Sequence, residues 1–305
     1  MLHHVTPLLP STPLSDLLGR PVWLKMESSQ PCGSFKLRGI GRACEAAVAS
    51  GARRVVASSG GNAGYAVAWS ARRLGIPSTV VVPSRTSHRM RSLIAAEGAE
   101  IVVHGEVWDD AHARAQVLAD ETGGVLIHPF DDPEVWAGHA TLVHEVAAAI
   151  PEPGFVVVAV GGGGLLAGVV HGLAEVGWSS PVLAVETHGA ASYARALEAG
   201  HPVDLDAIDS IALTLGAKRV CDESVAVSRG HRITSWTCDD RAAVEACARF
   251  LDDHRVLVEP SCGAALAAVY DGAPALSEAA SVVVVVCGGA AVTRGALDQW
   301  SASLA

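Results

Sequence analysis

A lysine occupies an unusual place in the segment QPCGSFKLRG, residues 30–39. Lys36 follows Gly33, Ser34 and Phe35 at the point where the amphipathic pattern of a helix begins. The N-terminal end of a helix is already positive, so a cation is disfavoured there unless its chemistry requires the position. An amine held in this place can condense with an aldehyde or move a proton. Lys36 is therefore a candidate reactive residue, with a solvated, incidental lysine as the alternative.

A run of four glycines, Gly161 to Gly164, follows the apolar segment FVVVAV and precedes a helical pattern. A backbone without side chains can direct several N–H groups at an anion, and the dipole of the next helix adds to the attraction, so the turn predicts a phosphate site. Gly162, Gly164 and Ala167 also match G-x-G-x-x-A, and Glu186 ends the next predicted strand, where a ribose-binding acid would lie. An NAD-dependent dehydrogenase therefore remains an alternative for this turn.

The segment SSGGNAG, residues 58–64, is a second turn between a predicted strand and a predicted helix. Ser59, Asn62 and the backbone N–H groups of this turn could hold a carboxylate, and the helix dipole favours that. An ordinary helix cap is the structural alternative. A phosphate site, a carboxylate clasp and a lysine together indicate pyridoxal phosphate acting on an amino acid, with Lys36 forming a Schiff base and later serving as a base. A dinucleotide site would explain neither Lys36 nor SSGGNAG.

Cys287 ends SVVVVVC, a segment so apolar that it predicts a central strand. It is either a buried structural thiol or a group that meets the pyridine nitrogen of the cofactor. A neutral thiol cannot keep that nitrogen protonated as a carboxylate would, which makes the ring a weaker electron acceptor. Such a ring suits reactions in which the carbanion is discharged quickly, such as loss of a β-hydroxyl.

The elements that must position these residues alternate along the chain. Short β-branched runs predict strands within residues 53–59, 78–83, 99–105, 155–161, 180–187 and 281–289, and helical patterns cover 62–75, 109–122 and 133–150. This order predicts an α/β fold with parallel strands covered on both faces, and ligands then bind at the carboxyl ends of the strands. Residues 150–155, IPEPGF, are the best candidate for a joint between lobes.

The composition narrows the class of function. The chain has 305 residues, half of them hydrophobic, and a net charge of −10, which argues against generic nucleic-acid binding and favours small metabolites. No apolar run is long enough to cross a membrane, and the N-terminus shows no signal-peptide pattern. Seven cysteines without C-x-x-C spacing predict reduced thiols in a cytoplasmic protein, and the histidines show no zinc-site spacing.

Several motifs, in order from about Thr6 to Gly289, resemble those of the L-serine dehydratase (L-serine ammonia-lyase) group, the serine/threonine dehydratase branch of the fold type II pyridoxal-phosphate enzymes. The lysine motif stands here as CGSFKLRG, with Cys32 in place of the usual serine. The others are SSGGNAG, PFDDPEVWAGHATLVHEV, VGGGGLLAGVVHGLAEVGW, VETHGA, VEPSCGAALAAVY and VVVCGG. The resemblance implies α,β-elimination of water from L-serine, giving pyruvate and ammonia, and from L-threonine, giving 2-oxobutanoate.

The resemblance also implies roles for individual residues. Phe35 would lie against the cofactor ring, Asn62 would contact its hydroxyl, and Cys287 would face its nitrogen. The residues expected to hold the cofactor are Phe35, Lys36, Asn62, Gly161, Gly162, Gly163, Gly164, Leu165 and Cys287. The substrate carboxylate would be held by Ser59, Gly60, Asn62 and Ala63. A monovalent cation such as potassium would be held by Glu186, Gly161, Ala190, Ser192, Leu215 and Ala217, with a helix-dipole or surface role as the alternative for Glu186.

The implied architecture is tryptophan synthase beta-like, with two open parallel-sheet domains and the cofactor in the cleft between them. The large domain would comprise residues 1–37 and 134–305, the small inserted domain residues 38–133, and the protein would be a homodimer. A fold type II lyase for threonine or a bulkier β-hydroxy amino acid remains an alternative, as does a sensor that binds the cofactor without turnover.

Two positions depart from the pattern or lack an explanation. Relatives often carry alanine where this chain has Gly60. The glycine predicts a roomier clasp, modest activity, and a gain in activity on Gly60→Ala. Thr214 lies where a small residue is expected near the second face of the ring, and its hydroxyl has no evident role.

Overall fold

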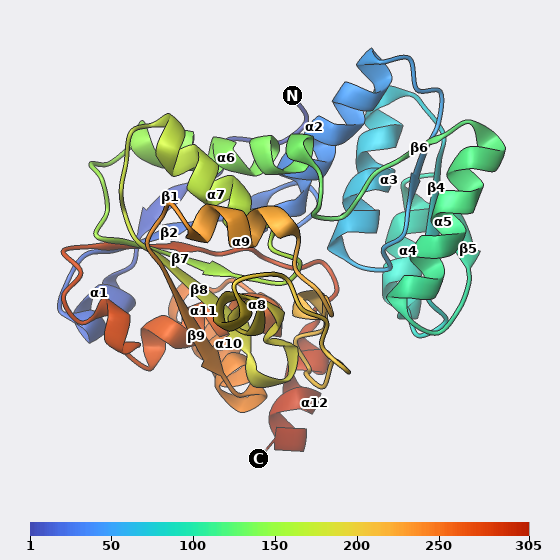
Figure 1. Cartoon of the computed structure of the whole chain (residues 1–305). Coiled ribbons are helices and arrows are strands. Elements are labelled where there is room, and N and C mark those ends of the chain that lie inside the picture. Colours follow the sequence, from blue (N-terminus) through green and yellow to red (C-terminus); the bar gives the residue numbers. More distant parts are fainter. Residues whose placement is uncertain (305) are drawn as a thin grey trace.

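The computed structural model describes residues 1–304 and shows two lobes, each built around its own β-sheet (Figure 1). In this part of the chain, neighbouring strands run parallel except β1 and β2, which are antiparallel. The larger sheet has the order β1 (Leu8–Pro10), β2 (Val22–Lys25), β10 (Val282–Val285), β7 (Phe155–Ala159), β8 (Val182–Thr187) and β9 (Ile233–Cys238). The smaller sheet has the order β5 (Glu100–Val103), β4 (Ser78–Val82), β3 (Val55–Ala57) and β6 (Val125–Leu126).

The six strands predicted from β-branched runs all form, as β3, β4, β5, β7, β8 and β10. Strand β10 lies between β2 and β7 and is buried along its whole length, which confirms that the segment before Cys287 is a central strand. The prediction missed β1, β2, β6 and β9. The first three are only two to four residues long, and β9, ITSWTC, mixes polar with apolar residues because it is an edge strand.

Helices cover both faces of the larger sheet, with α7 backed by α6 on one side and α11 backed by α10 on the other (Figure 1). The predicted helices are confirmed as α3, α5 and α6. The helices of the large lobe are α1 (Thr12–Leu18), α6 (Pro133–Ala147), α7 (Gly164–Glu175), α8 (Ser192–Ala199), α9 (Asp222–Ser228), α10 (Asp240–His254), α11 (Pro260–Tyr270) and α12 (Arg294–Leu304), and short 3-10 turns lie at Glu27–Ser29, His188–Ala190, Leu213–Leu215 and Pro274–Leu276. The small lobe contains α3 (Asn62–Leu74), α4 (His88–Ala96) and α5 (Trp108–Thr122).

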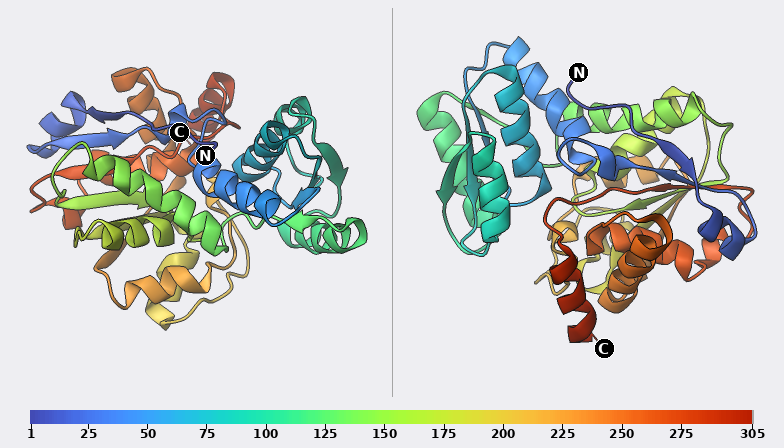
Figure 2. Two further views of the ribbon diagram at one scale, coloured as in Figure 1. Left: turned by 90° about the horizontal axis from the view of Figure 1, so that it is seen from above. Right: turned by 180° about the vertical axis from the view of Figure 1, so that it is seen from behind.

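Helix α2 (Lys36–Ala49) joins the two lobes, because it packs against α6 of the large lobe and α3 of the small lobe (Figure 2). The chain returns to the large lobe through residues 127–132, between β6 and α6. Residues 150–155 instead connect α6 to β7 within the large lobe, so the prediction of a joint there is wrong. The proline and glycine of that segment mark a tight connection between two packed elements.

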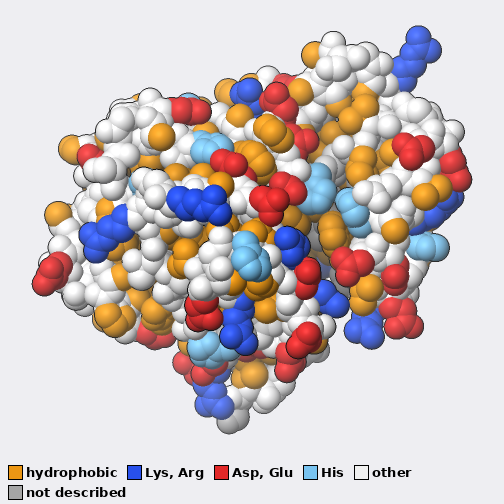
Figure 3. Space-filling view, viewed as in Figure 1, with side chains coloured by type: hydrophobic (Ala, Val, Ile, Leu, Met, Phe, Trp, Pro, Cys, Tyr) orange, Lys and Arg blue, Asp and Glu red, His pale blue; other side chains and the backbone are white. Residues whose placement is uncertain are grey.

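Each lobe has its own hydrophobic core, so each can act as a rigid support for the residues at its edge. The seven cysteines are buried and free, as predicted. Acidic and basic side chains are interspersed on the face in Figure 3, without a large patch of one sign. Within residues 1–304, no helix combines the length and the apolar character needed to span a bilayer.

Candidate active site

The loop after β10 contacts the segment that carries the lysine, and the turn at residues 58–64 contacts that loop. The backbone of residues 33–35 pairs with the loop after β10: Ser34 bridges Gly288, the Phe35 N–H donates to the Cys287 carbonyl at 3.1 Å, and the Gly289 N–H donates to the Gly33 carbonyl at 2.8 Å. The clasp turn, residues 58–64, contacts the loop after β10, because the Ala290 N–H donates to Asn62 Oδ1 at 2.9 Å. The structure thus brings together segments more than two hundred residues apart in sequence.

Helix α2 begins at Lys36, which confirms the helix start expected from the sequence. The Lys36 amine donates to the carbonyl of Pro129 at 2.6 Å and lies 5.2 Å from the centre of the Phe35 ring. Burial lowers the pKa of Lys36 to about 8, and the acidic groups of Cys287, Cys221 and Glu259 offset part of that shift. A lysine with this pKa is partly neutral near neutral pH, which is the form that can attack an aldehyde or accept a proton.

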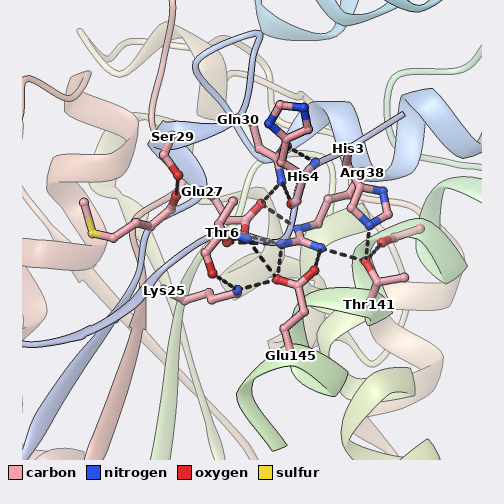
Figure 4. A network of polar contacts seen from close by, with 12 residues as sticks. His3, His4, Thr6, Lys25, Glu27, Ser29, Gln30, Arg38, Thr141 and Glu145 are labelled. Atoms are coloured by element: carbon pink, nitrogen blue, oxygen red, sulfur yellow. Dashed lines mark hydrogen bonds and ion pairs between the residues drawn. The ribbon is translucent and has the colours of Figure 1, made fainter. Parts of the chain in front are cut away.

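A buried ionic network holds the first turn of α2 in place (Figure 4). Arg38 binds Glu27 with Nε at 2.7 Å and Nη2 at 2.8 Å, and binds both oxygens of Glu145 at 2.7 Å. Lys25 donates to the carbonyl of Thr6 at 2.7 Å and to Glu145 at 2.5 Å. Glu27 precedes the lysine segment, and Glu145 lies on α6. By binding both carboxylates, the Arg38 guanidinium holds the lysine segment against the large lobe.

The glycine turn, Gly161 to Gly164, leaves no room for side chains. Gly163 has φ +88°, and a Cβ there would lie 2.5 Å from the Cβ of Ser224. The ring of Phe130 lies on Gly162, where a Cβ would come within 2.3 Å of the ring, and the Phe130 carbonyl similarly blocks Gly164 at 2.5 Å. Helix α7 begins at Gly164, and Leu165 is buried in its first turn. Bare backbone at a helix N-terminus matches the requirements of a phosphate group.

The clasp turn precedes α3, with Gly61 as its extended N-cap and Ala63 buried in the first turn. The Ser59 hydroxyl accepts from the Gly61 N–H at 3.2 Å. The expected spare room at Gly60 is absent: a Cβ there would lie 2.1 Å from Thr86 Oγ1 and 2.7 Å from Thr86 Cγ2. The prediction of a roomier clasp is therefore wrong, because a side chain from the loop after β4 occupies the space.

Glu259 is a site residue that the sequence prediction missed. Its Oε1 accepts from Asn62 Nδ2 at 2.8 Å and from the Thr214 hydroxyl at 2.5 Å, so the Thr214 hydroxyl has a partner. Because the single Thr214 proton goes to Glu259, the Ser261 hydroxyl, 2.5 Å away, donates to Thr214 Oγ1. Burial raises the pKa of Glu259 to about 7, against the opposing effects of its two donors and of Lys36. An acidic residue inside the apolar segment VLVEPSCGAAL was the available signal.

Cys287 is buried at the end of β10, beside Cys262. The hydrogen bond with Cys262 and burial both raise the pKa of Cys287 well above its ordinary value. The thiol is therefore neutral, which is the state expected for a group facing a pyridine nitrogen. Phe35, on the other side of the lysine segment, packs against the buried ring of His139 with centroids 5.0 Å apart.

Glu186 lies at the end of β8, where its carboxylate accepts from the N–H groups of Tyr193 at 2.7 Å and Ala194 at 2.8 Å. Burial raises its pKa to about 7. The hydroxyl of Ser192 is buried nearby on the same helix end and has no hydrogen-bond partner in the described part of the chain. Glu186 therefore caps α8 and has an unsatisfied oxygen close by. The other predicted cation ligands are Gly161 and Leu215, which lie close together, and the backbone groups of Ala190 and Ala217.

The residues around Lys36 fit pyridoxal phosphate on three independent observations. The amine has a lowered pKa, the glycine turn has no space for side chains, and a neutral thiol ends the central strand. Lys36 would hold the aldehyde end and Gly161 to Gly164 the phosphate. Cys287 would face the ring nitrogen, where an enzyme that keeps the ring protonated would carry an acid.

Comparisons with known proteins agree with this fit. Residues 1–288 match the family model described as pyridoxal-phosphate dependent enzyme. The chain is 51% identical to mouse "Serine dehydratase-like" over 97% of this chain and 93% of that protein, and 46% identical to human "L-serine dehydratase/L-threonine deaminase" over 97% and 94%. The crystal structure of a fungal L-serine ammonia-lyase from Rhizomucor miehei superposes with a TM-score of 0.92 at 38% identity, covering 98% of both chains. The chain belongs to the family of pyridoxal-phosphate dependent enzymes, with the fold type II architecture.

Proposed function

We propose that this protein is an L-serine dehydratase, which eliminates water from L-serine to give pyruvate and ammonia and acts in the same way on L-threonine to give 2-oxobutanoate. The observation that carries the proposal is the Lys36 amine, with its pKa lowered to about 8, bonded to the Pro129 carbonyl next to Phe130, whose ring lies on the glycine turn. The relatives named as serine dehydratases, at 46% identity and above over nearly the whole chain, support the choice of substrate.

Bound pyridoxal phosphate supplies an aldehyde that links to amines and a ring that withdraws electrons from the α-carbon of the substrate. Lys36 would hold the cofactor through its amine, and the same amine in its neutral form would accept the α-proton of the substrate. Ser59, Gly60 and Ala63 hold the substrate carboxylate at the N-terminus of α3, where the helix dipole favours a negative charge. Asn62 contacts the cofactor.

Phe35 supports the ring, and Cys287 leaves the ring nitrogen without a proton. A ring left unprotonated by the neutral Cys287 thiol would withdraw electrons weakly, and such chemistry would suit loss of a β-hydroxyl. The NAD-dependent alternative has no use for a lysine of lowered pKa, and the family assignment removes it.

We further propose the domain boundaries and the accessory features that the motifs imply. The large domain comprises residues 1–37 and 134–305, and the small domain residues 38–133. Glu186 and the unsatisfied Ser192 hydroxyl, with carbonyls of Gly161, Ala190, Leu215 and Ala217, form a shell for potassium. The enzyme is a cytoplasmic homodimer, as its resemblance to the dehydratases implies.

The test is an absorbance spectrum of the purified protein before and after L-serine, with pyruvate and ammonia assayed together. A visible cofactor band that changes with serine, with both products in equal amounts, is the expected result, and Lys36→Ala should abolish both. A band without serine turnover directs the same assay to threonine and bulkier β-hydroxy amino acids. A cofactor-bound protein inert to all of them would contradict the lyase proposal and indicate a sensor.

A further inference from the structure

Glu259 is the one carboxyl group among residues 1–304 that bonds directly to a residue proposed to hold the cofactor. It is the N-cap residue of α11, yet its side chain does not cap that helix. The side chain instead turns inward, is 5% exposed, and places Oε2 over Gly289, where a Cβ would come within 2.1 Å of that oxygen. A buried carboxyl group is costly, so its placement needs a compensating function or a dense set of donors.

The Asn62 amide is held from both sides by the large lobe. Its Nδ2 donates to Glu259 Oε1 at 2.8 Å, and its Oδ1 accepts from the Ala290 N–H at 2.9 Å. Arg89 of the small lobe makes a second contact with Ala290: its Nε donates to the Ala290 carbonyl at 3.2 Å. Asn62 is therefore the point where the N-terminus of α3 attaches to the large lobe.

The chemistry of the two partners fixes the direction of the amide. Glu259 Oε1 accepts from the Thr214 hydroxyl and the Ala290 N–H only donates, so Nδ2 must face Glu259 and Oδ1 must face Ala290. The Thr214 hydroxyl, at 2.5 Å, keeps Oε1 in place for this contact. With a side chain at position 259 that both donates and accepts, only the Ala290 N–H would still select the direction of the amide.

We propose that Glu259 is a positioning residue of the cofactor site, which holds the Asn62 amide in one orientation and joins α3 to the large lobe at the same point. The inference rests on the proposed role of Asn62 toward the cofactor.

The experiment uses Glu259→Gln, which keeps the shape of the side chain but lets position 259 both donate and accept. We expect the affinity of the cofactor-free protein for pyridoxal phosphate, measured by absorbance titration, to fall about tenfold, the size expected for losing one charge-assisted hydrogen bond. The absorbance maximum of the bound cofactor should shift as well. Glu152→Gln is the matched control, because the Glu152 carboxylate also accepts a hydrogen bond, from the Ser179 N–H at 2.6 Å, but on the surface and away from Asn62.

The double variant Glu259→Gln with Asn62→Asp separates orientation from attachment. It restores an amide–carboxylate pair between the lobes with the two groups exchanged, so the melting temperature of the cofactor-free protein should recover, while cofactor affinity should stay low. Because this pair is complementary, it also provides a folded protein if the single variant does not fold.

Two results would overturn the proposal: unchanged affinity and spectrum in Glu259→Gln, or full recovery of affinity in the double variant, which would make Glu259 a tether only. Failure of the proposed function is distinguishable, because in that case the wild-type protein would bind the cofactor without forming pyruvate from serine.

Discussion

Replacing Gly60 by alanine tests whether Thr86 limits the space around the substrate carboxylate. Gly60 lies in the turn after β3 and Thr86 in the loop after β4, so the two belong to neighbouring strand ends of the small lobe. An alanine Cβ at position 60 would lie 2.1 Å from Thr86 Oγ1, 2.7 Å from Cγ2 and 3.0 Å from Cβ. All three contacts are shorter than ordinary van der Waals separation, so one loop must move.

The size of the effect follows from these distances. Bringing the hydroxyl oxygen of Thr86 to a normal separation requires a displacement of about 1 Å, and misplacing reacting groups by that amount can cost about 100-fold in rate. Overpacking of this kind also destabilises by about 1–3 kcal/mol. We expect kcat/KM for L-serine to fall by about 10- to 100-fold in Gly60→Ala, opposite to the gain that the sequence alone suggests.

The assay is pyruvate formation from L-serine in a double-mutant cycle. Thr86→Ala removes the two atoms in closest contact, so it should restore most of the activity lost in Gly60→Ala. Gly61→Ala is the neighbouring comparison, because a Cβ there would meet only Ser59 Oγ and Thr214 Cγ2, both at 3.8 Å, and its effect should be smaller. Higher activity in Gly60→Ala, or additive effects of the two substitutions, would refute the reasoning.

Two further predictions concern Lys36 and the network behind it. Acetylation of the cofactor-free protein, followed by mass spectrometry, should modify Lys36 with a pH midpoint of about 8, because burial lowers the pKa of its amine and the reactive neutral form accumulates as pH rises through 8. The exposed Lys218 provides an accessible reference. A midpoint at the ordinary lysine value for Lys36 would contradict the assigned burial. Arg38→Met should cost about 3–5 kcal/mol in urea unfolding, because it leaves the buried Glu27 without its cation and Glu145 with Lys25 alone. The same change at Arg42, whose pair with Glu134 is exposed on the same helix, should cost no more than about 1 kcal/mol, and equal losses at the two positions would show that burial does not decide the effect.

The sequence predicted the elements whose pattern is local. Strands such as β10 and β7 are buried on both faces, so every residue is apolar and the run stands out. The glycine turn and the clasp turn are recognisable for a similar reason, because backbone approaching a ligand needs residues without side chains. Strands β1 and β6 are too short to show a period, and their existence depends on the neighbours with which they pair.

The features that the sequence did not predict depend on contacts between distant segments. Thr86 carries no local signal of its position, since a threonine in a loop is common, and the acid inside the apolar segment around Glu259 does not tell which residue it contacts. Only the folded chain shows that one accepts from Asn62 and the other fills the space at Gly60. The joint predicted at residues 150–155 failed for a related reason, because a Pro/Gly segment marks a turn and does not tell which elements pack on either side.

The position of Lys36 could be predicted from the local sequence, whereas its reactivity depends on contacts between distant segments. The motif around it places an amine at the start of a helix, but the lowered pKa requires burial, and the partners that enclose the amine come from separate parts of the chain. Pro129 accepts its hydrogen bond from 93 residues away, and Cys287 and Glu259 lie in two later motifs. A lysine motif alone therefore predicts where the amine is, whereas the remaining motifs determine whether it is neutral enough to act as a base.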